Sequence, residues 1–342
     1  MTLPPALRVL LWPASLLFQL YARLRAWCYR RGIRRQNRLA GAVVSVGNLT
    51  VGGTGKTPMV IWLAERLYAE GKPVGILTRG YRGASRQGEH GVARSDEVAL
   101  LRERLGKKAQ LGVGADRYAS GQVLERHGVN FFVLDDGFQH LRIARDVDLV
   151  LLDATDPFGG GYLLPAGRLR EPKSALGRAD FVVITRSEHA PAVEAVVRRH
   201  TAAPIFYAHT RLEGVFPLLP GVAPTQLIEC QGKKFFAFCG IGNPAAYFED
   251  LRRWGLEIAA SASYPDHHRY SRRDAEILER SALRTGADAL LCTEKDIFNF
   301  DAIQFQPLPV FFCRMALEIP DAESLWQALT ETLRRKRPGV QR

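Results

Sequence analysis

A chain of 342 residues with 46% apolar side chains is long enough for two domains with ordinary hydrophobic cores. Lys and Arg outnumber Asp and Glu by 47 to 35, a basic balance that suits phosphates, nucleic acid or an anionic membrane surface without choosing among them. The cysteines include no close pair, which argues against a zinc knuckle or a disulfide framework and is typical of a reducing compartment: Cys28, Cys230, Cys239, Cys292 and Cys313.

The N-terminal segment, residues 1–40, combines an apolar run with a cluster of arginines. Residues 9–22 carry no charge and are interrupted by Pro13. This run is shorter than the roughly 20 residues that a spanning helix needs, and no small-residue cleavage site follows it, so we predict neither a transmembrane helix nor a removed signal peptide. The aromatic residues and the arginines favour an interfacial membrane-association helix, although a helix packed on the protein's own core remains the alternative.

Residues 42–58, AVVSVGNLTVGGTGKTP, predict a strand, a glycine loop and a helix. The usual phosphate loop would have glycine where Thr50 stands, so the match is to the Gly-Gly-x-Gly-Lys-Thr variant. Glycines let backbone N–H groups converge on a phosphate, Lys56 can reach the terminal phosphates, and Thr57 can offer its hydroxyl to Mg²⁺. A simple turn into a helix would not need the Lys-Thr pair. The predicted ATP-binding residues are Thr50, Val51, Gly52, Gly53, Thr54, Gly55, Lys56 and Thr57.

The next predicted strand, residues 73–78, ends in Arg79-Gly80-Tyr81. In a parallel α/β sheet the loops after the strands line the ligand crevice, so Arg79 and Tyr81 are candidates for substrate contact. A surface turn explains them equally well. Arg117 is a further candidate for contact with an anion.

A helix is predicted from Ser95 to Leu105. Ser95 can act as its N-cap, and Asp96 and Glu97 favour the first turn, so helix capping explains these residues without a function. From the residues alone, capping is the favoured interpretation.

Residues 131–140, FFVLDDGFQH, describe a buried strand that ends in two carboxylates. A strand of this kind delivers acids to the carboxyl edge of the sheet, where a Walker B acid meets the Mg²⁺ held by the phosphate loop. The sequence does not decide whether Asp135 or Asp136 would bind the metal. Further strands are predicted at 148–153 and 181–185, and the arginine-rich loop 163–172 between them either contacts the nucleotide or its metal or is a solvated crossover.

The second half of the chain restarts the alternation of strands and helices. Prolines and glycines in residues 210–234 predict a domain junction, and strands are predicted at 235–239, 289–293 and 310–313. The charged Glu294-Lys295-Asp296 follows one strand, and a helix cap explains it as well as a function does. We therefore predict an α/β fold with a parallel-sheet kinase domain at 41–212, a linker at 213–234, a smaller α/β domain at 235–334 and a basic tail at 335–342.

Short motifs follow one another along almost the whole chain: 45–48 (SVGN), 52–58 (GGTGKTP), 79–81 (RGY), 95–97 (SDE), 135–140 (DDGFQH), 165–172 (PAGRLREP), 240–244 (GIGNP), 266–268 (DHH) and 293–296 (TEKD). Many nucleotide enzymes share the phosphate loop, but the full set in this order is highly specific. It resembles the tetraacyldisaccharide 4'-kinase family of lipid A biosynthesis. Ser95 stands where that family's motif has glycine.

The resemblance implies a P-loop NTPase-like domain whose kinase activity transfers the γ-phosphate of ATP to the 4'-hydroxyl of tetraacyldisaccharide 1-phosphate, forming lipid IVA. It implies Asp96 as the catalytic carboxylate and His267 as its partner. Because these two lie far apart in sequence, we expect the second domain to fold back on the first. Thr57, Asp136 and Glu171 are implied for the metal, and the implied substrate-binding residues are Arg79, Tyr81, Arg117, Asp135, Gln139 and Arg170.

The implied partners are ATP with Mg²⁺, the acylated disaccharide lipid and an anionic membrane surface, with the enzyme peripheral on the cytoplasmic face of the inner membrane. No nucleic acid and no obligate protein partner are expected. A nucleotide-dependent switch is a rival interpretation, but no Asn-Lys-x-Asp follows a late strand to recognise guanine. A nucleic-acid-binding protein is suggested only by the formal charge of +12, and we find no strand with aromatic and basic residues interleaved.

Overall fold

The computed structural model describes residues 4–80, 95–218, 230–300, 303 and 305–339. The chain divides into two compact units. The first contains Met1–Ala93, Leu101–His209 and Leu317–Arg342, and the second contains Arg94–Leu100 and Thr210–Ala316.

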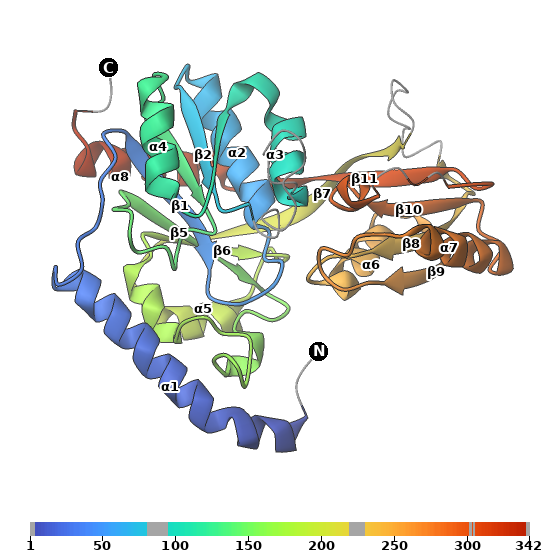
Figure 1. Cartoon of the computed structure of the whole chain (residues 1–342), viewed down its shortest axis with the longest axis horizontal. Helices are drawn as coiled ribbons and strands as arrows, with labels where there is room; N and C mark the ends of the chain where they lie inside the picture. Colours follow the sequence, from blue (N-terminus) through green and yellow to red (C-terminus); the bar gives the residue numbers. More distant parts are fainter. Residues whose placement is uncertain (1–3, 81–94, 219–229, 301–302, 304, 340–342) are drawn as a thin grey trace. The chain divides into compact units, whose positions relative to one another are not determined.

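The first unit is built on a parallel sheet with the strand order β3-β2-β4-β1-β5-β6-β7 (Figure 1). Strands β1, β2, β4, β5 and β6 are buried along their whole length, as expected for parallel strands that are covered on both faces. The bounds are β1 (Ala42–Asn48), β2 (Val74–Thr78), β3 (Gln110–Val113), β4 (Phe131–Asp135), β5 (Val147–Asp153), β6 (Phe181–Thr185) and β7 (Ile205–Pro217). The predicted α/β fold class is confirmed.

Helices cover this sheet because each has an apolar stripe that needs a partner. Helix α2 buries Met59, Leu63 and Leu67 in the same core as residues of β1 and β4. The other helices that contribute residues to the first unit are α1 (Pro5–Arg30), α3 (Asp96–Leu105), α4 (Arg117–Arg126), α5 (Pro191–Arg198) and α8 (Ala322–Lys336), with α2 at Lys56–Ala69. Short 3-10 helices lie at Gly106–Lys108, Gly159–Gly161 and Lys173–Arg178.

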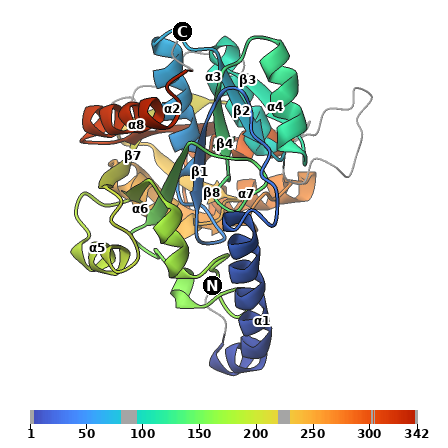
Figure 2. The same ribbon diagram turned by 90° about the vertical axis from the view of Figure 1, so that its left-hand side faces the viewer.

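Helix α1 continues through Pro13 and lies along one side of the first unit (Figure 2). Ser15, which is buried, donates through Oγ to the carbonyl of Leu163 at 2.6 Å and accepts from the backbone N–H of Ala166 at 3.2 Å. Arg25 donates to the carbonyl of Gln139 at 3.0 Å. Among the described residues, no helix has both the length and the apolar character needed to cross a bilayer.

The second unit has a parallel sheet with the strand order β11-β10-β8-β9. Its strands are β8 (Lys234–Cys239), β9 (Glu257–Ser263), β10 (Ala289–Thr293) and β11 (Val310–Glu318), and its helices are α6 (Pro244–Arg253), α7 (Arg272–Arg284) and the 3-10 turn Asp296–Asn299. Apolar clusters lie on both faces of this sheet, one with Tyr247 of α6 and one with Leu278 of α7. Strands β7 and β11 each contain residues of both units.

The units differ from the predicted domain ranges in three segments. The segment Arg94–Leu100 belongs to the second unit, and Leu317–Arg342 belongs to the first. Helix α8 buries its apolar stripe in the core of the first unit, where Trp326 meets Trp62 edge to face at 6.0 Å. Of the predicted linker, the residues up to Pro217 form the end of β7, and 219–229 lie outside the described residues.

Candidate active site

The phosphate loop connects the carboxyl end of β1 to the first turn of α2. Gly52 has φ +124° and Gly55 has φ +84°, which are backbone conformations that other residues rarely adopt. Within the described part of the chain, no side chain caps the N-terminus of α2. Its first N–H groups therefore remain available to a phosphate, at the positive end of the helix dipole.

The carboxylate of Asp136 faces this loop from the end of β4. Its Oδ2 accepts a hydrogen bond from Arg170 at 2.6 Å, and Lys56 Nζ lies 3.6 Å from its Oδ1. Burial alone would raise the pKa of Asp136, but the charges of Lys56 and Arg170 outweigh burial and lower it. Asp135, the neighbouring acid, instead accepts a hydrogen bond from Thr78 Oγ1 at 3.1 Å. Asp136 is therefore the acid that faces the phosphate loop.

The donor set near the loop fits a hard cation in part. Asp136 Oδ1 is buried and accepts no hydrogen bond within the described residues, and Thr57 lies in the first turn of α2. Carboxylate and hydroxyl oxygens suit Mg²⁺, which usually keeps several waters and phosphate oxygens as ligands. Glu171 is committed elsewhere, because both of its oxygens accept hydrogen bonds from Arg178, at 2.8 and 2.9 Å. The described residues hold no cluster of three or more potential ligands that would bind a metal without the nucleotide.

The arginine-rich loop 163–172 reaches the phosphate loop. Arg168 donates to the carbonyl of Val51 at 2.8 Å, and the Val51 N–H donates to the carbonyl of Arg168 at 2.8 Å. The backbone N–H of Arg170 donates to the carbonyl of Leu49 at 2.7 Å. This loop therefore packs against the phosphate loop and is not a solvated crossover.

Three of the predicted substrate-binding residues lie on the same edge of the first sheet. Arg117, only 5% exposed at the start of α4, donates to the carbonyl of Asp136 at 3.2 Å. Burial lowers the pKa of its guanidinium, and Asp135 and Asp136 oppose that effect. Gln139 donates to the carbonyl of Asn48 at 2.9 Å. Arg79 follows β2 and is exposed, whereas Tyr81 lies outside the described residues.

The second unit holds the predicted catalytic pair, Asp96 and His267. His267 Nδ1 lies 2.9 Å from both carboxylate oxygens of Asp96. Asn299 donates to Asp96 Oδ2 at 3.1 Å, and the backbone N–H of Glu97 donates to Oδ1 at 2.9 Å. His267 has φ +61° and donates its N–H to the carbonyl of Gly240 at 3.0 Å. Hydrogen bonds therefore hold both the carboxylate of Asp96 and the backbone of His267 in place.

The location of Asp96 corrects one expectation from the sequence. The segment Arg94–Leu100 belongs to the second unit, so Asp96 and His267 form their contact within that unit. The second unit does not have to fold back on the first to pair them. The physical reason is that α3 spans the boundary, with Val98 on one side and Leu101 on the other.

The electrostatics of this pair favour an ionised Asp96. Burial raises the pKa of Asp96, but the hydrogen bond from His267 and the charge of Lys295 outweigh burial and lower it. The hydrogen bond to Asp96 raises the pKa of His267, and burial and Lys295 oppose that effect without cancelling it. The adjacent His268 contacts Asp274 at 3.3 Å and is not part of the pair.

Sequence reasoning assigned no role to Asn299, Arg178 or Thr78, and left Lys295 open. The signal for Lys295 was present in the motif Thr-Glu-Lys-Asp at 293–296. Asn299 carries no local signal, because it approaches Asp96 only through the tertiary fold.

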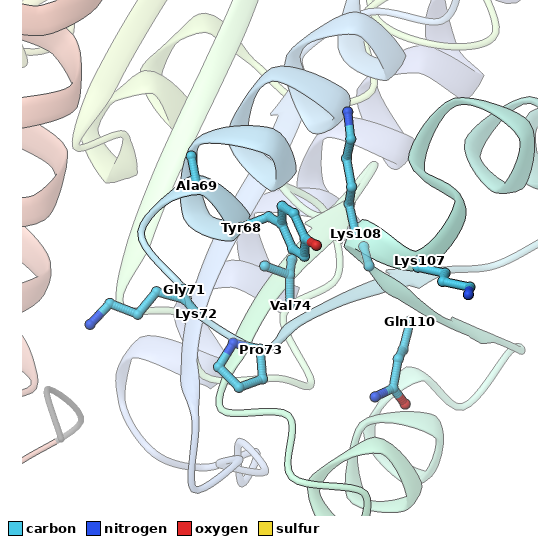
Figure 3. A pocket seen from close by; sticks show the side chains of 10 residues that line it. Tyr68, Ala69, Gly71, Lys72, Pro73, Val74, Lys107, Lys108 and Gln110 are labelled. Carbon is cyan, nitrogen blue, oxygen red and sulfur yellow. The ribbon is translucent and has the colours of Figure 1, made fainter.

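A surface pocket of about 520 Å³ lies away from these residues (Figure 3). It is lined by Tyr68 at the end of α2, Val74 at the start of β2 and Gln110 at the start of β3. The amino ends of the strands form this edge of the sheet. Ligands of open parallel sheets bind at the carboxyl ends, where the phosphate loop lies, so this pocket is not the nucleotide site.

Known proteins resemble this chain over almost its full length. The family model for Tetraacyldisaccharide-1-P 4'-kinase matches residues 7–334. The tetraacyldisaccharide 4'-kinase of Geobacter metallireducens is 39% identical over 332 residues, covering 93% of this chain and 96% of the relative. That of Geobacter sulfurreducens is 40% identical, covering 95% and 93%. A crystal structure of LpxK from Aquifex aeolicus, described as an "apo" form in complex with ATP, has a TM-score of 0.74 and 28% identity, covering 95% of this chain and 99% of that one. This chain belongs to the tetraacyldisaccharide-1-P 4'-kinase family.

Proposed function

We propose that this chain is a kinase that transfers the γ-phosphoryl group of ATP to the 4'-hydroxyl of tetraacyldisaccharide 1-phosphate and forms lipid IVA. The observation that carries this function is the family match over residues 7–334, which includes both the phosphate loop and the Asp96–His267 pair. The predicted kinase activity and its place in lipid A biosynthesis are confirmed by these relatives. Each unit supplies one part of the chemistry.

The first unit binds and neutralises the triphosphate. The N–H groups at the start of α2 and the ammonium group of Lys56 hold the phosphates, and Arg170 and Arg117 add positive charge beside Asp136. Mg²⁺ bound with ATP would be held by Asp136 and Thr57 and would neutralise the charge that develops on the phosphate oxygens. Glu171 stays a predicted ligand that acts only if Arg178 releases it.

The second unit supplies the proton acceptor. The 4'-oxygen attacks the γ-phosphorus, the bond from that phosphorus to the β–γ bridging oxygen breaks, and ADP leaves. The hydroxyl proton moves to a carboxylate oxygen of Asp96, whose lowered pKa keeps it ionised and ready at neutral pH. His267 Nδ1–H orients this carboxylate. Because phosphoryl transfer depends mainly on positioning and charge, a weak base is sufficient.

The substrate's acyl chains require the enzyme to work at a bilayer surface. Helix α1 exposes many large apolar side chains, among them Val9 at 76%, Leu10 at 75%, Leu17 at 70% and Leu20 at 64%. An apolar helix face followed by arginines partitions into the headgroup region of anionic membranes. We propose that α1 binds the cytoplasmic face of the inner membrane peripherally.

The decisive experiment measures transfer of labelled γ-phosphate from ATP to purified tetraacyldisaccharide 1-phosphate in detergent micelles, with and without Mg²⁺. The expected result is a metal-dependent bisphosphorylated lipid. Strong ATP hydrolysis without the lipid acceptor, and no transfer by folded protein that binds ATP, would instead support a nucleotide switch. Vesicle flotation of the full chain tests the membrane proposal separately.

A further inference from the structure

The loop that follows β10 places a lysine beside the Asp96–His267 pair of the second unit. Lys295 Nζ lies 3.5 Å from His267 Nε2 and 3.8 Å from Asp96 Oδ2. It also lies 3.5 Å from Asp266 Oδ1 and 3.8 Å from Glu97 Oε1. Only 19% of its side chain is exposed. A lysine held among three carboxylates and a histidine ring is not an exposed helix cap.

The backbone around this lysine is fixed by its neighbour Asp296, which is fully buried. Asp296 Oδ1 accepts hydrogen bonds from the Gly240 N–H at 2.8 Å and the Tyr270 hydroxyl at 2.9 Å. Its Oδ2 accepts from the hydroxyl and the N–H of Thr293. The carbonyl of Gly240 also accepts a hydrogen bond from the backbone N–H of His267. The segments that carry Lys295 and His267 are therefore both held by hydrogen bonds to the backbone of Gly240.

The contacts of Lys295 determine the tautomer of the ring. Burial lowers the pKa of Lys295, but Asp96, Glu97 and Asp266 outweigh burial and raise it, so the group is charged at neutral pH. An ammonium group only donates hydrogen bonds, so a hydrogen bond from Lys295 to the ring requires a lone pair on His267 Nε2. The ring proton then resides on Nδ1, which faces Asp96.

Without this lysine the ring would stand between two carboxylates. Asp96 lies 2.9 Å from Nδ1, and Asp266 Oδ2 lies 3.6 Å from Nε2 of His267. Two opposite charges favour the doubly protonated imidazolium. The charge of Lys295 opposes that form and also pairs with Asp266.

We propose that Lys295 is a positioning residue that favours the His267 tautomer protonated on Nδ1 and disfavours a second proton on Nε2. In this tautomer Asp96 accepts a hydrogen bond from Nδ1 and remains a carboxylate. The tautomer does not depend on the proposed function, whereas its effect on turnover rests on that function.

The direct test is ¹⁵N-histidine NMR of the full-length protein as a function of pH, with His267 assigned through a His267→Gln variant. Lys295→Met should make His267 titrate at higher pH, because the opposing charge is gone and Asp266 keeps only His267 as its ion-pair partner among the described residues. Lys295→Arg, which keeps the charge, should retain the wild-type titration. Lys234→Met is the matched control, since Lys234 is 53% exposed and pairs only with Glu257, at 3.6 Å, among the ion pairs of the described residues. Equal titration of His267 in Lys295→Met and wild type would overturn the proposal.

The second readout is the pH profile of transfer. In the active pair Asp96 is ionised and His267 carries a single proton, on Nδ1, so raising the pKa of His267 moves the acidic limb of the profile to higher pH. For Lys295→Met, the ratio of turnover at pH 6 to turnover at pH 8.5 should fall about fivefold, while Lys295→Arg and Lys234→Met keep the wild-type ratio. An equal loss at every pH would indicate a purely structural role and overturn the proposal. If wild type shows no transfer, the proposed function fails, and the NMR titration still decides the role of Lys295.

Discussion

The two regions that we propose to be catalytic are built in opposite ways. The phosphate loop is one uninterrupted stretch between β1 and α2, and its glycines, lysine and threonine act where they stand in the sequence. The Asp96–His267 pair is assembled from the start of α3 and a loop after β9, and Asn299 arrives from a third segment after β10. In a local motif the functional residues are neighbours in the sequence. In an assembled pair, both the geometry and the pKa values depend on the fold.

The variant with the largest expected effect tests whether proton acceptance can be lost while nucleotide binding is kept. Asp96→Asn keeps the size of the side chain but removes the proton acceptor, so turnover should fall about 10²- to 10⁴-fold. ATP affinity, measured by calorimetry, should stay unchanged because the phosphate loop is intact. Asn299→Ala is the matched probe of positioning, since it removes one donor to Asp96 and should cost less. Loss of ATP binding in Asp96→Asn would show that the two regions are not separable.

A second variant probes the opposite region. Asp136→Asn keeps the shape but removes the charge that faces Lys56, and it weakens the acceptor for Arg170. We expect about a 10²-fold fall in turnover, in line with the loss of one electrostatic group at a transferring phosphoryl, and a higher Mg²⁺ concentration for half-maximal rate. Asp135→Asn is the control, because Asp135 accepts from Thr78. A greater Mg²⁺ requirement in Asp135→Asn than in Asp136→Asn would reverse the assignment.

Helix α1 differs from both regions, because its proposed role is to bind the membrane and not to take part in phosphoryl transfer. Replacing Leu10 and Leu17 by Asp adds charge to the exposed apolar face. Each leucine contributes about 1.5–3 kcal/mol when buried in an apolar phase, so vesicle binding should fall at least about tenfold. Turnover on a water-soluble, short-chain acceptor should be retained. Equal binding to anionic vesicles by variant and wild type would contradict the membrane proposal.

The sequence predicted the first region well and the second only through resemblance. Residues 42–58 and 131–140 carry strand, turn and acid in one stretch, so their periodicity and residue types sufficed. Asp96 and Glu97 instead have the pattern of an ordinary helix start, and the motif at 266–268 gives no local reason to prefer His267 over His268. The preference arises from the left-handed backbone of His267 and its bond to Gly240, which only the folded chain contains.

The sequence did not predict the boundaries of the two units, for a related reason. The amphipathic pattern of α8 predicts a helix but does not indicate which of the two hydrophobic cores the helix packs on. The chain returns to the first unit only at Leu317. The side chain of Arg66 in α2 meets Glu323 of α8, and Glu70 accepts from the indole of Trp326 at 2.7 Å. These pairs are separated by more than half of the chain, so no local signal could reveal them.

The smallest expected effect tests whether even the local region depends on distant residues. Arg337, just after α8, donates to the carbonyls of Leu39 and Gly41 and pairs with Asp146 at 3.0 Å. These carbonyls lie at the entrance to β1, which leads into the phosphate loop. Arg337→Ala should therefore lower the free energy of unfolding by about 1–3 kcal/mol, since it leaves Asp146 with one cation fewer.

Chemical denaturation gives this free energy, and the exposed Arg335→Ala is the control. The carboxylate of Asp146 also accepts from the backbone N–H of Val43 at 2.9 Å and from Arg38 at 3.3 Å, so the strand should remain in place and ATP affinity should change little. A large loss of ATP affinity without a loss of stability would mean that the C-terminal residues tune the loop itself. In that case the phosphate loop, too, would be an assembled site, and the contrast with the Asp96–His267 pair would be one of degree.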